Sequence, residues 1–190
     1  MLVDRIQTMR SDGPRRVLVA IDGGSGAGKS SFARKIGDEL GAAVIDGDDF
    51  YAGGTAAEWD AMSAVEKAAH CIDWRRQRPV LEALAHGRRA SWFPYDWDAD
   101  DGRLVERPNV CEPAPVIILE GVYSARPELS DLFDLRVLYD APADVRRRRI
   151  VEREGEDHRT EWNARWEEAE RWYFTRVMMP EAFDLVLAAI

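Results

Sequence analysis

The residues with the clearest chemical signature form one continuous segment, Gly-Gly-Ser-Gly-Ala-Gly-Lys-Ser at positions 23–30, which matches G-x-x-x-x-G-K-[ST]. An apolar, β-branched run of strand length precedes it at 16–22. After it, residues 31–40 carry apolar side chains at four-residue spacing and stop at Gly41. A strand, a glycine-rich turn and a helix in this order predict a loop that binds phosphate. A chance glycine-rich turn does not account for the glycines, the lysine and the serine in this order.

The predicted loop has a physical reason to hold the phosphates of a nucleoside triphosphate such as ATP. Glycines allow successive backbone N–H groups to turn inward, and the following helix adds free amides and the positive end of its dipole. Lys29 is expected to reach the outer phosphates, and the Ser30 hydroxyl is expected to bind Mg²⁺. The residues predicted to bind the nucleotide are Gly23, Gly24, Ser25, Gly26, Ala27, Gly28, Lys29, Ser30 and Ser31.

The composition restricts the class of protein. A chain of 190 residues suits a single domain, 1–190, with a substantial core. Its net charge of −9 provides no overall basic field for nucleic acid or an anionic membrane, and no apolar run approaches the ~20 residues that span a bilayer. Cys71 and Cys111 form no C-x-x-C pair, which indicates reduced thiols. We therefore expect a cytoplasmic protein with a small-molecule partner, and a homo-oligomer is compatible with this composition.

Apolar runs and helical periodicities alternate along the rest of the chain. Residues 1–14 are expected to be a short helix or a frayed lead-in, and helices are expected in two pieces over 56–87 that join near 72–74, from Pro142 and from Thr160. Further strands are expected at 42–46, 116–119, 135–139 and 184–188. This alternation predicts an α/β fold with a parallel sheet covered by helices on both faces.

Two features of the aromatic residues add to this prediction. The helix from Thr160 carries one apolar stripe, formed by Trp162, Trp166, Ala169, Tyr173 and Val177. Short runs at 91–97 and 103–107, joined through Asp101-Gly102, predict a hairpin-like insertion. Within the first run, Trp92 and Phe93 are expected to belong to the core.

Five segments carry a specific resemblance to a known family. They are the loop at 23–30, Asp48-Asp-Phe-Tyr51, Tyr95-Asp-Trp97, Glu120-Gly-Val122, and Asp140-Ala-Pro-Ala-Asp144 followed by an arginine-rich helix. Over residues 16–160 the sequence resembles the uridine kinase-like branch of P-loop kinases, which includes phosphoribulokinase and pantothenate kinase relatives. The resemblance implies a three-layer P-loop NTPase fold with a central five-stranded parallel sheet. It also implies a substrate-binding insertion at 88–110 and an arginine-bearing lid at 145–160.

Asp48 follows the second predicted strand, at the edge of the sheet where ligands of α/β proteins bind. In the resembled family the matching Asp acts as the base or orienting carboxylate toward the acceptor hydroxyl. A carboxylate that merely caps a turn is the alternative for Asp48, and it is the interpretation favoured for Asp46 and Asp49.

Glu120 ends another predicted strand, and the resemblance implies that it joins Ser30 in binding Mg²⁺. A solvated strand-end Glu is the alternative. Asp22, just before the loop, is expected to be a structural hydrogen-bond acceptor.

Arginines at 146–149 and 153 would bring positive charge to the phosphates. Four successive arginines cover every side of a helix, so some of them are ordinary solvated charges. Arg149 and Arg153 share a face, and in the lid of the resembled family such arginines neutralise charge that develops during transfer. The family's second consecutive Arg matches Ile150 here, which leaves the register open. Arg159 is a further candidate for substrate binding at the far end of the lid.

The residues chosen for acceptor binding are Tyr51, Asp73, Tyr95 and Asp96. The resemblance implies that Asp73 binds ribose hydroxyls and that Tyr95 lies beside the base, and aromatic faces suit a planar nucleobase. The family also has a hairpin His that helps to recognise a pyrimidine, whereas this chain has Asp98-Ala-Asp-Asp101 there.

Three functions are compatible with these residues. The leading prediction is an ATP- and Mg²⁺-dependent kinase of a small-molecule hydroxyl group, with a nucleoside as acceptor. The second is a kinase of another metabolite, such as pantothenate, a sugar or an antibiotic, and the missing hairpin His favours it. The third is a regulatory ATPase that acts on a protein partner, for which the sequence provides no switch segment.

Overall fold

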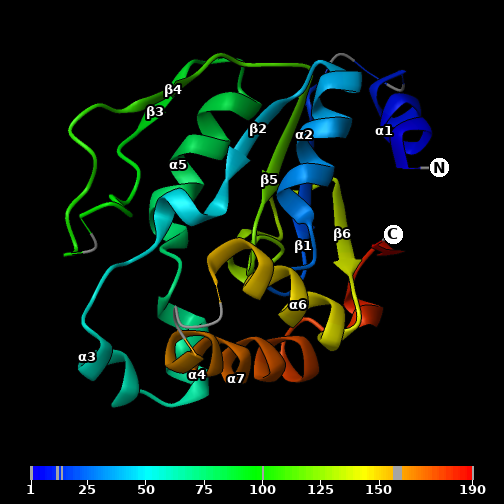
Figure 1. The fold of residues 1–190 in the computed structure, drawn as a ribbon. Helices are drawn as coiled ribbons and strands as arrows, with labels where there is room; N and C mark the ends of the chain where they lie inside the picture. Colours follow the sequence, from blue (N-terminus) through cyan, green and yellow to red (C-terminus); the bar gives the residue numbers. More distant parts are fainter. Residues whose placement is uncertain (1, 12, 14, 100, 156–159, 190) are drawn as a thin grey trace.

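The computed structural model describes residues 2–11, 13, 15–99, 101–155 and 160–189, and its centre is a five-stranded sheet (Figure 1). The spatial order is β2-β5-β1-β6-β7, and every pairing is parallel. The predicted α/β fold with a central five-stranded parallel sheet is therefore confirmed. The strands are β1 (Val17–Asp22), β2 (Ala43–Asp46), β5 (Val116–Glu120), β6 (Leu135–Asp140) and β7 (Leu185–Ala188).

Both faces of the sheet are covered, as Figure 1 shows. Val19 and Ile21 of β1 pack with helices α1 (Leu2–Ser11) and α2 (Lys29–Leu40) on one face. Leu18 and Ala20 belong to the core on the other face, where the helices are α4 (Ala64–His70), α5 (Trp74–Ala85) and α7 (Thr160–Arg176). All six residues of β1 are buried, because a central parallel strand has no solvent-facing side.

Residues 56–87 form three helices, so the prediction of two pieces was wrong. A short α3 (Ala56–Asp60) precedes α4 and α5. Thr55 with Glu58, and Ser63 with Glu66, each form a capping box in which side chain and backbone satisfy one another at a helix start. The two S/T-x-x-E patterns were visible in the sequence, and each of them begins a separate helix.

The insertion is a hairpin, although its strands differ from those predicted. β3 (Ala90–Trp92) pairs antiparallel with β4 (Asn109–Cys111), and an isolated bridge joins Tyr95 to Leu104. The longer predicted strands fail because Pro94 has no N–H for the ladder and the Tyr95 N–H donates to Asp49 O at 2.9 Å.

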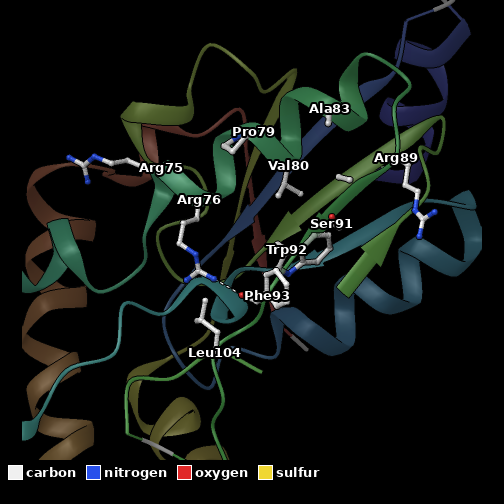
Figure 2. A pocket seen from close by; sticks show the side chains of 11 residues that line it. Arg75, Arg76, Pro79, Val80, Ala83, Arg89, Ser91, Trp92, Phe93 and Leu104 are labelled. Carbon is white, nitrogen blue, oxygen red and sulfur yellow. Dashed lines mark hydrogen bonds between the residues drawn. The ribbon is translucent and has the colours of Figure 1, made fainter. Parts of the chain in front are cut away.

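The hairpin lies against α5 across a cavity of about 500 Å³ (Figure 2). Val80 and Ala83 line it from α5, and Trp92 lines it from β3. Trp92 is buried as expected, whereas Phe93 is 47% exposed, which corrects its assignment to the core. Side chains alternate across a strand, so the neighbour of a buried Trp92 faces outward.

Two further helices lie between β6 and β7 in the chain: α6 (Ala143–Glu154) and α7. Trp166, Ala169 and Tyr173 of the predicted stripe are buried, and Val177 is half-buried. The side chain of Trp162 lies outside the described part of the structure. Short 3₁₀ helices occur at Gly47–Phe50 (η1), Pro127–Leu129 (η2) and Pro180–Ala182 (η3). None of the helices in the described ranges combines the length and the apolar content that crossing a bilayer would require.

Candidate active site

The predicted phosphate loop connects β1 to α2. Gly28 is the N-cap of α2 with φ of 96°, a left-handed conformation that a side chain would strain, so the helix starts directly at Lys29. The Ala27 N–H donates to Gly24 O at 3.1 Å and closes the turn. Lys29 is only 7% exposed, and its Nζ donates to the same Gly24 carbonyl at 3.1 Å. The ammonium group therefore lies across the loop, where a phosphate group would be bound.

A cleft of about 200 Å³ opens beside the loop. Three other segments complete its wall: the turn after β2, the end of β5 and one face of α6. Its lining residues are Ser25, Gly26, Gly28, Lys29, Ser30, Ser31, Asp48, Glu120, Gly121, Val122, Arg149 and Arg153. The four residues predicted to be catalytic, and both predicted metal ligands, thus line one cleft.

Asp48 lies on η1, the turn that follows β2. Its backbone N–H donates to Asp46 Oδ1 at 2.9 Å, so Asp46 is the residue that caps the turn. The surrounding protein raises the pKa of Asp48 by desolvation, while the charges of Lys29 and Arg153 lower it. Because the Asp48 side chain is exposed to solvent in the open cleft, this desolvation is incomplete. The Asp48 carboxylate thus shares the cleft with Lys29 and Arg153, the two cations that influence its pKa.

Asp49, the neighbour of Asp48, has a structural role. Its Oδ2 accepts hydrogen bonds from Trp92 Nε1 at 2.7 Å and from Asn109 Nδ2 at 2.8 Å. These contacts attach η1 to both strands of the hairpin. The prediction that Asp46 and Asp49 are structural is therefore consistent with their contacts.

Glu120 is 3% exposed at the end of β5 and lies opposite Asp46 in the parallel register. Burial raises its pKa to about 7, and the charges of Asp46 and Asp48 add to this, while Ser30 and Lys29 oppose it. Burial and the charge of Asp48 likewise raise the pKa of Asp46 to about 6. Carboxylates that repel one another in this way favour a bound cation.

The oxygen donors at this point fit Mg²⁺. The ion takes oxygen ligands and usually keeps several waters, so a hydroxyl and one or two carboxylates suffice. Ser30 and Glu120 supply those groups on the same cleft. Within the described ranges, no three His, Cys, Asp or Glu side chains are arranged as a metal cage. A metal bound by protein ligands alone would need such a cage, whereas Mg²⁺ that keeps several waters does not.

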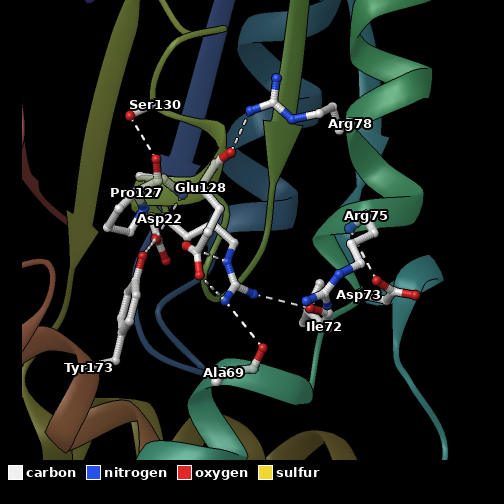
Figure 3. Close-up of polar contacts among 12 residues, drawn as sticks. Asp22, Ala69, Ile72, Asp73, Arg75, Arg78, Pro127, Glu128, Ser130 and Tyr173 are labelled. Carbon is white, nitrogen blue, oxygen red and sulfur yellow. Dashed lines mark hydrogen bonds and ion pairs between the residues drawn. The ribbon is translucent and has the colours of Figure 1, made fainter.

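Asp22 is the structural hydrogen-bond acceptor that the sequence suggested (Figure 3). Its carboxylate accepts from the backbone N–H groups of Gly23 at 2.8 Å, Tyr123 at 2.9 Å and Ala125 at 3.0 Å. The Tyr173 hydroxyl donates to it at 3.0 Å from α7. Burial raises the pKa of Asp22 to about 6 against these hydrogen bonds, which lower it. Asp22 thus connects the start of the phosphate loop to the turn after β5 and to α7.

The arginines of α6 divide into different roles. Arg149 Nη1 donates to Ala27 O of the loop at 2.9 Å, and Arg153 lines the cleft near Asp48. Arg147 instead pairs with Glu167 of α7 at 2.6 Å, away from the cleft. Of the predicted lid at 145–160, residues 156–159 lie outside the described residues, and Arg159 with them.

A sequence model described as the Phosphoribulokinase / Uridine kinase family matches residues 18–161. The chain belongs to this family. A uridine kinase of Halobacterium salinarum is 33% identical over 142 residues, which are 72% of this chain and 61% of the relative. A uridine kinase of Clostridium perfringens is 28% identical over 137 residues, or 70% of this chain and 65% of the relative. The chain therefore spans less than two thirds of the length of these curated relatives.

Solved structures share the fold of this family member. The "Possible Uridine Kinase" of Bacillus stearothermophilus superposes with a TM-score of 0.67 at 19% identity, over 98% of both chains. Phosphoribulokinase from Rhodobacter spheroides gives 0.62 at 12% identity, over 92% of this chain and 70% of that one. These similarities confirm the P-loop kinase fold predicted from the sequence.

In this member of the Phosphoribulokinase / Uridine kinase family, the residues predicted to bind the acceptor lie beyond η1 and outside the cleft lining. Tyr51 and Tyr95 are buried, and their rings meet edge to face at 4.9 Å. Asp73 caps α5 by accepting from Arg75 N at 3.1 Å, as Figure 3 shows, and Asp96 caps the turn at Asp98 and Ala99. Both carboxylates thus have local partners.

Sequence reasoning missed part of the environment of Tyr51. Trp97 stacks on Tyr51 at 4.9 Å, and Trp59 and Trp166 approach it at 6.0 and 6.1 Å. These rings come from four separate segments, so no local pattern could associate them. The five residues Tyr51, Trp59, Tyr95, Trp97 and Trp166 are hereafter the aromatic cluster.

Glu170 of α7 was also missed. It is 5% exposed, and its carboxylate accepts from the Ser25 N–H at 3.0 Å and from the Ser25 hydroxyl. The available signal was an acidic residue beside Ala169 and one turn before Tyr173, on the face of the helix that was expected to be apolar.

Proposed function

We propose that this protein is an ATP- and Mg²⁺-dependent kinase that transfers the γ-phosphoryl group to a hydroxyl group of a small molecule, with a nucleoside as the leading acceptor. One observation carries the proposal. The phosphate loop, the Asp48 carboxylate on the turn after β2, the Glu120 carboxylate at the end of β5 and two arginines of α6 all line the same cleft. Membership of the Phosphoribulokinase / Uridine kinase family supports it.

The loop and Lys29 hold the triphosphate in this proposal. Transfer of a phosphoryl group spreads negative charge over its outer oxygens, so positioning and positive charge account for most of the rate acceleration. Backbone N–H groups at the start of α2 and the Lys29 ammonium face the cleft and supply this charge. Arg149 and Arg153 add to it from the opposite wall.

Asp48 orients the acceptor hydroxyl and accepts its proton. A weak base such as a carboxylate suffices here. In a loose transition state the bond from the nucleophile to phosphorus is barely formed, so the hydroxyl loses its proton late. Its raised pKa makes it a better proton acceptor than an ordinary Asp, and nearby Lys29 and Arg153 keep it ionised. Ser30 and Glu120 would hold Mg²⁺, which when bound supplies positive charge to the phosphate oxygens.

A nucleoside is the leading acceptor because the curated relatives are uridine kinases and because Trp97, the exposed ring of the aromatic cluster at 38%, can stack on a planar nucleobase. A kinase of another metabolite is the second candidate. Asp98 and Asp101 occupy the hairpin segment where the resembled family has a His, and carboxylates favour polyhydroxylated or cationic acceptors. The acidic net charge argues against a nucleic-acid partner, and two cysteines without a C-x-x-C pair are in keeping with a cytoplasmic location.

The test is a γ-phosphoryl transfer assay with ATP and Mg²⁺ across nucleosides, sugars, pantothenate and amino alcohols. Binding of a nonhydrolysable ATP analogue is measured in parallel, and Lys29→Ala serves as the inactive control. We expect one acceptor class to give a phosphorylated product. Tight analogue binding without any product would overturn the kinase proposal, and hydrolysis stimulated only by a protein partner would favour a regulatory ATPase.

A further inference from the structure

The tip of the phosphate loop is held from outside by an ion pair between the partly exposed Arg146 and the buried Glu170. Glu170 accepts from the Ser25 N–H at 3.0 Å and from the Ser25 hydroxyl. Arg146 Nη1 donates to Ser25 O at 3.1 Å and lies 3.3 Å from Glu170 Oε2. The N–H, hydroxyl and carbonyl of one loop residue are thus all bound by two side chains from α6 and α7.

The packing at this point is close. The Glu170 side chain is 6% exposed, and the Arg146 side chain is 20% exposed. A Cβ atom at Gly24 would overlap the Arg146 guanidinium and lie 3.0 Å from Glu170 Oε2. The lack of a side chain at Gly24 therefore lets Arg146 and Glu170 come close to the loop, and it is not required by an unusual backbone angle. A buried carboxylate is costly unless it is paired and hydrogen-bonded, and here both conditions are met.

We infer that Glu170, assisted by Arg146, is a positioning residue for the ATP phosphates. It holds the Gly24–Ser25 peptide so that the loop amides from Gly26 onward face the cleft. The Ser25 N–H donates to Glu170, so this amide is not available to a phosphate. The inference depends on the proposed function, because it assumes that the loop binds ATP. It also assigns Arg146 to the loop, whereas Arg149 and Arg153 face the phosphates.

A second contact supports a positioning role over simple helix packing. Arg149, one turn after Arg146 on α6, donates to Ala27 O at 2.9 Å. The loop is therefore attached to α6 at the carbonyls of Ser25 and Ala27 and to α7 at the amide of Ser25. Inside the loop, Lys29 binds Gly24 O. Removing the Glu170 contact frees the tip while Lys29, Arg149 and Arg153, which line the cleft, stay unchanged.

The chain contains a matched control. Arg147 and Glu167 form a second ion pair between α6 and α7 at 2.6 Å, but their side chains are 66% and 41% exposed, and in the described part of the chain neither hydrogen-bonds to the loop. Glu167→Gln and Glu170→Gln make the same change of charge on the same helix. Only Glu170→Gln alters the loop, so a difference between the two variants measures the loop contact.

The experiment measures the Kd of a nonhydrolysable ATP analogue with Mg²⁺, the KM for ATP and kcat, for the wild type, Glu170→Gln, Glu167→Gln, Ser25→Ala and the double variant at 25 and 170. We expect Glu170→Gln to weaken analogue binding about tenfold or more, since it disturbs a buried, charged hydrogen bond. Glu167→Gln should stay within about twofold of the wild type. The Ser25 and Glu170 effects should be less than additive, because they remove the same contact.

Several results would overturn the inference. If Glu170→Gln binds the analogue as tightly as the wild type and only its melting temperature falls, then the Arg146–Glu170 pair stabilises the packing of the helices and does not position the loop. Tighter binding in Glu170→Gln would mean that the carboxylate opposes the phosphates. If Glu170→Gln does not fold, a further variant, Arg146→Gln, decides, because it removes the ion pair with Glu170 and the charged contact to Ser25 O, and unchanged affinity there contradicts the inference. A wild type that binds no analogue would refute the proposed function as well, which separates the two failures.

Discussion

The phosphate side and the acceptor side of the proposed active site are built differently. The phosphate side is one continuous segment between β1 and α2, with its lysine at the first position of the helix. The acceptor side is the aromatic cluster, whose five rings come from the end of η1, from α3, from the hairpin and from α7. A single loop can keep its geometry while the cluster changes, so one kinase scaffold can serve different acceptors.

The two sides meet at η1. Asp48 lies in the cleft, Asp49 is bound to the hairpin through Trp92 and Asn109, and Tyr51 enters the aromatic cluster. These residues lie within four positions of one another. A change at the hairpin can therefore reach the proposed catalytic carboxylate through one short turn. The comparison predicts that variants on the phosphate side alter ATP use, whereas variants of the cluster alter acceptor use.

The largest effect is expected for Lys29→Ala. Removing the ammonium group takes away positive charge that the transition state requires, so turnover should fall by about three orders of magnitude or more. The hydrogen bond of the lysine goes to a loop carbonyl and not to a core residue, so the melting temperature should change far less than turnover does. Phosphoryl transfer and thermal unfolding measure the two quantities. Near-normal turnover would show that the loop does not bind the transferred phosphate.

Asp48→Asn should come next. The amide cannot accept the proton of the hydroxyl, and we expect kcat to fall about a hundredfold to a thousandfold. Affinity for the ATP analogue should stay within a few-fold, since the loop is untouched. Steady-state kinetics and analogue titration separate these two effects. A large loss of ATP affinity with unchanged kcat would place Asp48 on the phosphate side instead.

Glu120→Gln tests the electrostatics of the proposed Mg²⁺ site. The pKa of Glu120 is raised to about 7 from an ordinary 4.5, so between these pH values the folded state holds a proton that the unfolded state has lost. The metal-free wild type should therefore lose stability as pH rises from about 4.5 to 7 and level off above that range, a total change on the order of 1–3 kcal/mol.

The variant should show a shallower decline and exceed the wild type in stability at pH 8. It should also lose most of the thermal stabilisation that Mg²⁺ gives the wild type with an ATP analogue at pH 8. Urea unfolding at pH 5 and 8 without metal measures the first effect, and thermal unfolding at pH 8 with the ATP analogue, with and without Mg²⁺, measures the second. An unchanged slope, together with full Mg²⁺ stabilisation, would remove Glu120 from the site.

The smallest effect is expected for Trp97→Ala in the aromatic cluster. Trp97 is 38% exposed and stacks on Tyr51, so its loss should cost about 1 kcal/mol or less of folding stability. The KM for the acceptor should rise a few-fold, while the KM for ATP stays the same. A change in the KM for ATP alone would break the proposed division between the two sides.

Local patterns in the amino-acid sequence determined the fold class and the phosphate loop. Five parallel strands, helices on both faces and a helix that starts at Lys29 follow from apolar periodicity and glycine placement, which act over a few neighbouring residues. The boundary between α3 and α4 was equally local, since it follows from two capping boxes, but the prediction overlooked them.

Only the tertiary structure decided which distant residues meet. Hydrogen bonds to Asp49 draw the hairpin off its predicted strands, and the rings of the aromatic cluster converge from segments more than a hundred residues apart in the chain. The successive arginines look equivalent in the sequence, yet Arg146 faces Glu170, Arg147 faces Glu167 and Arg149 faces the loop. Partners across the fold are chosen by packing and by the pairing of buried charges. A linear pattern carries no information about which side chains those forces bring together.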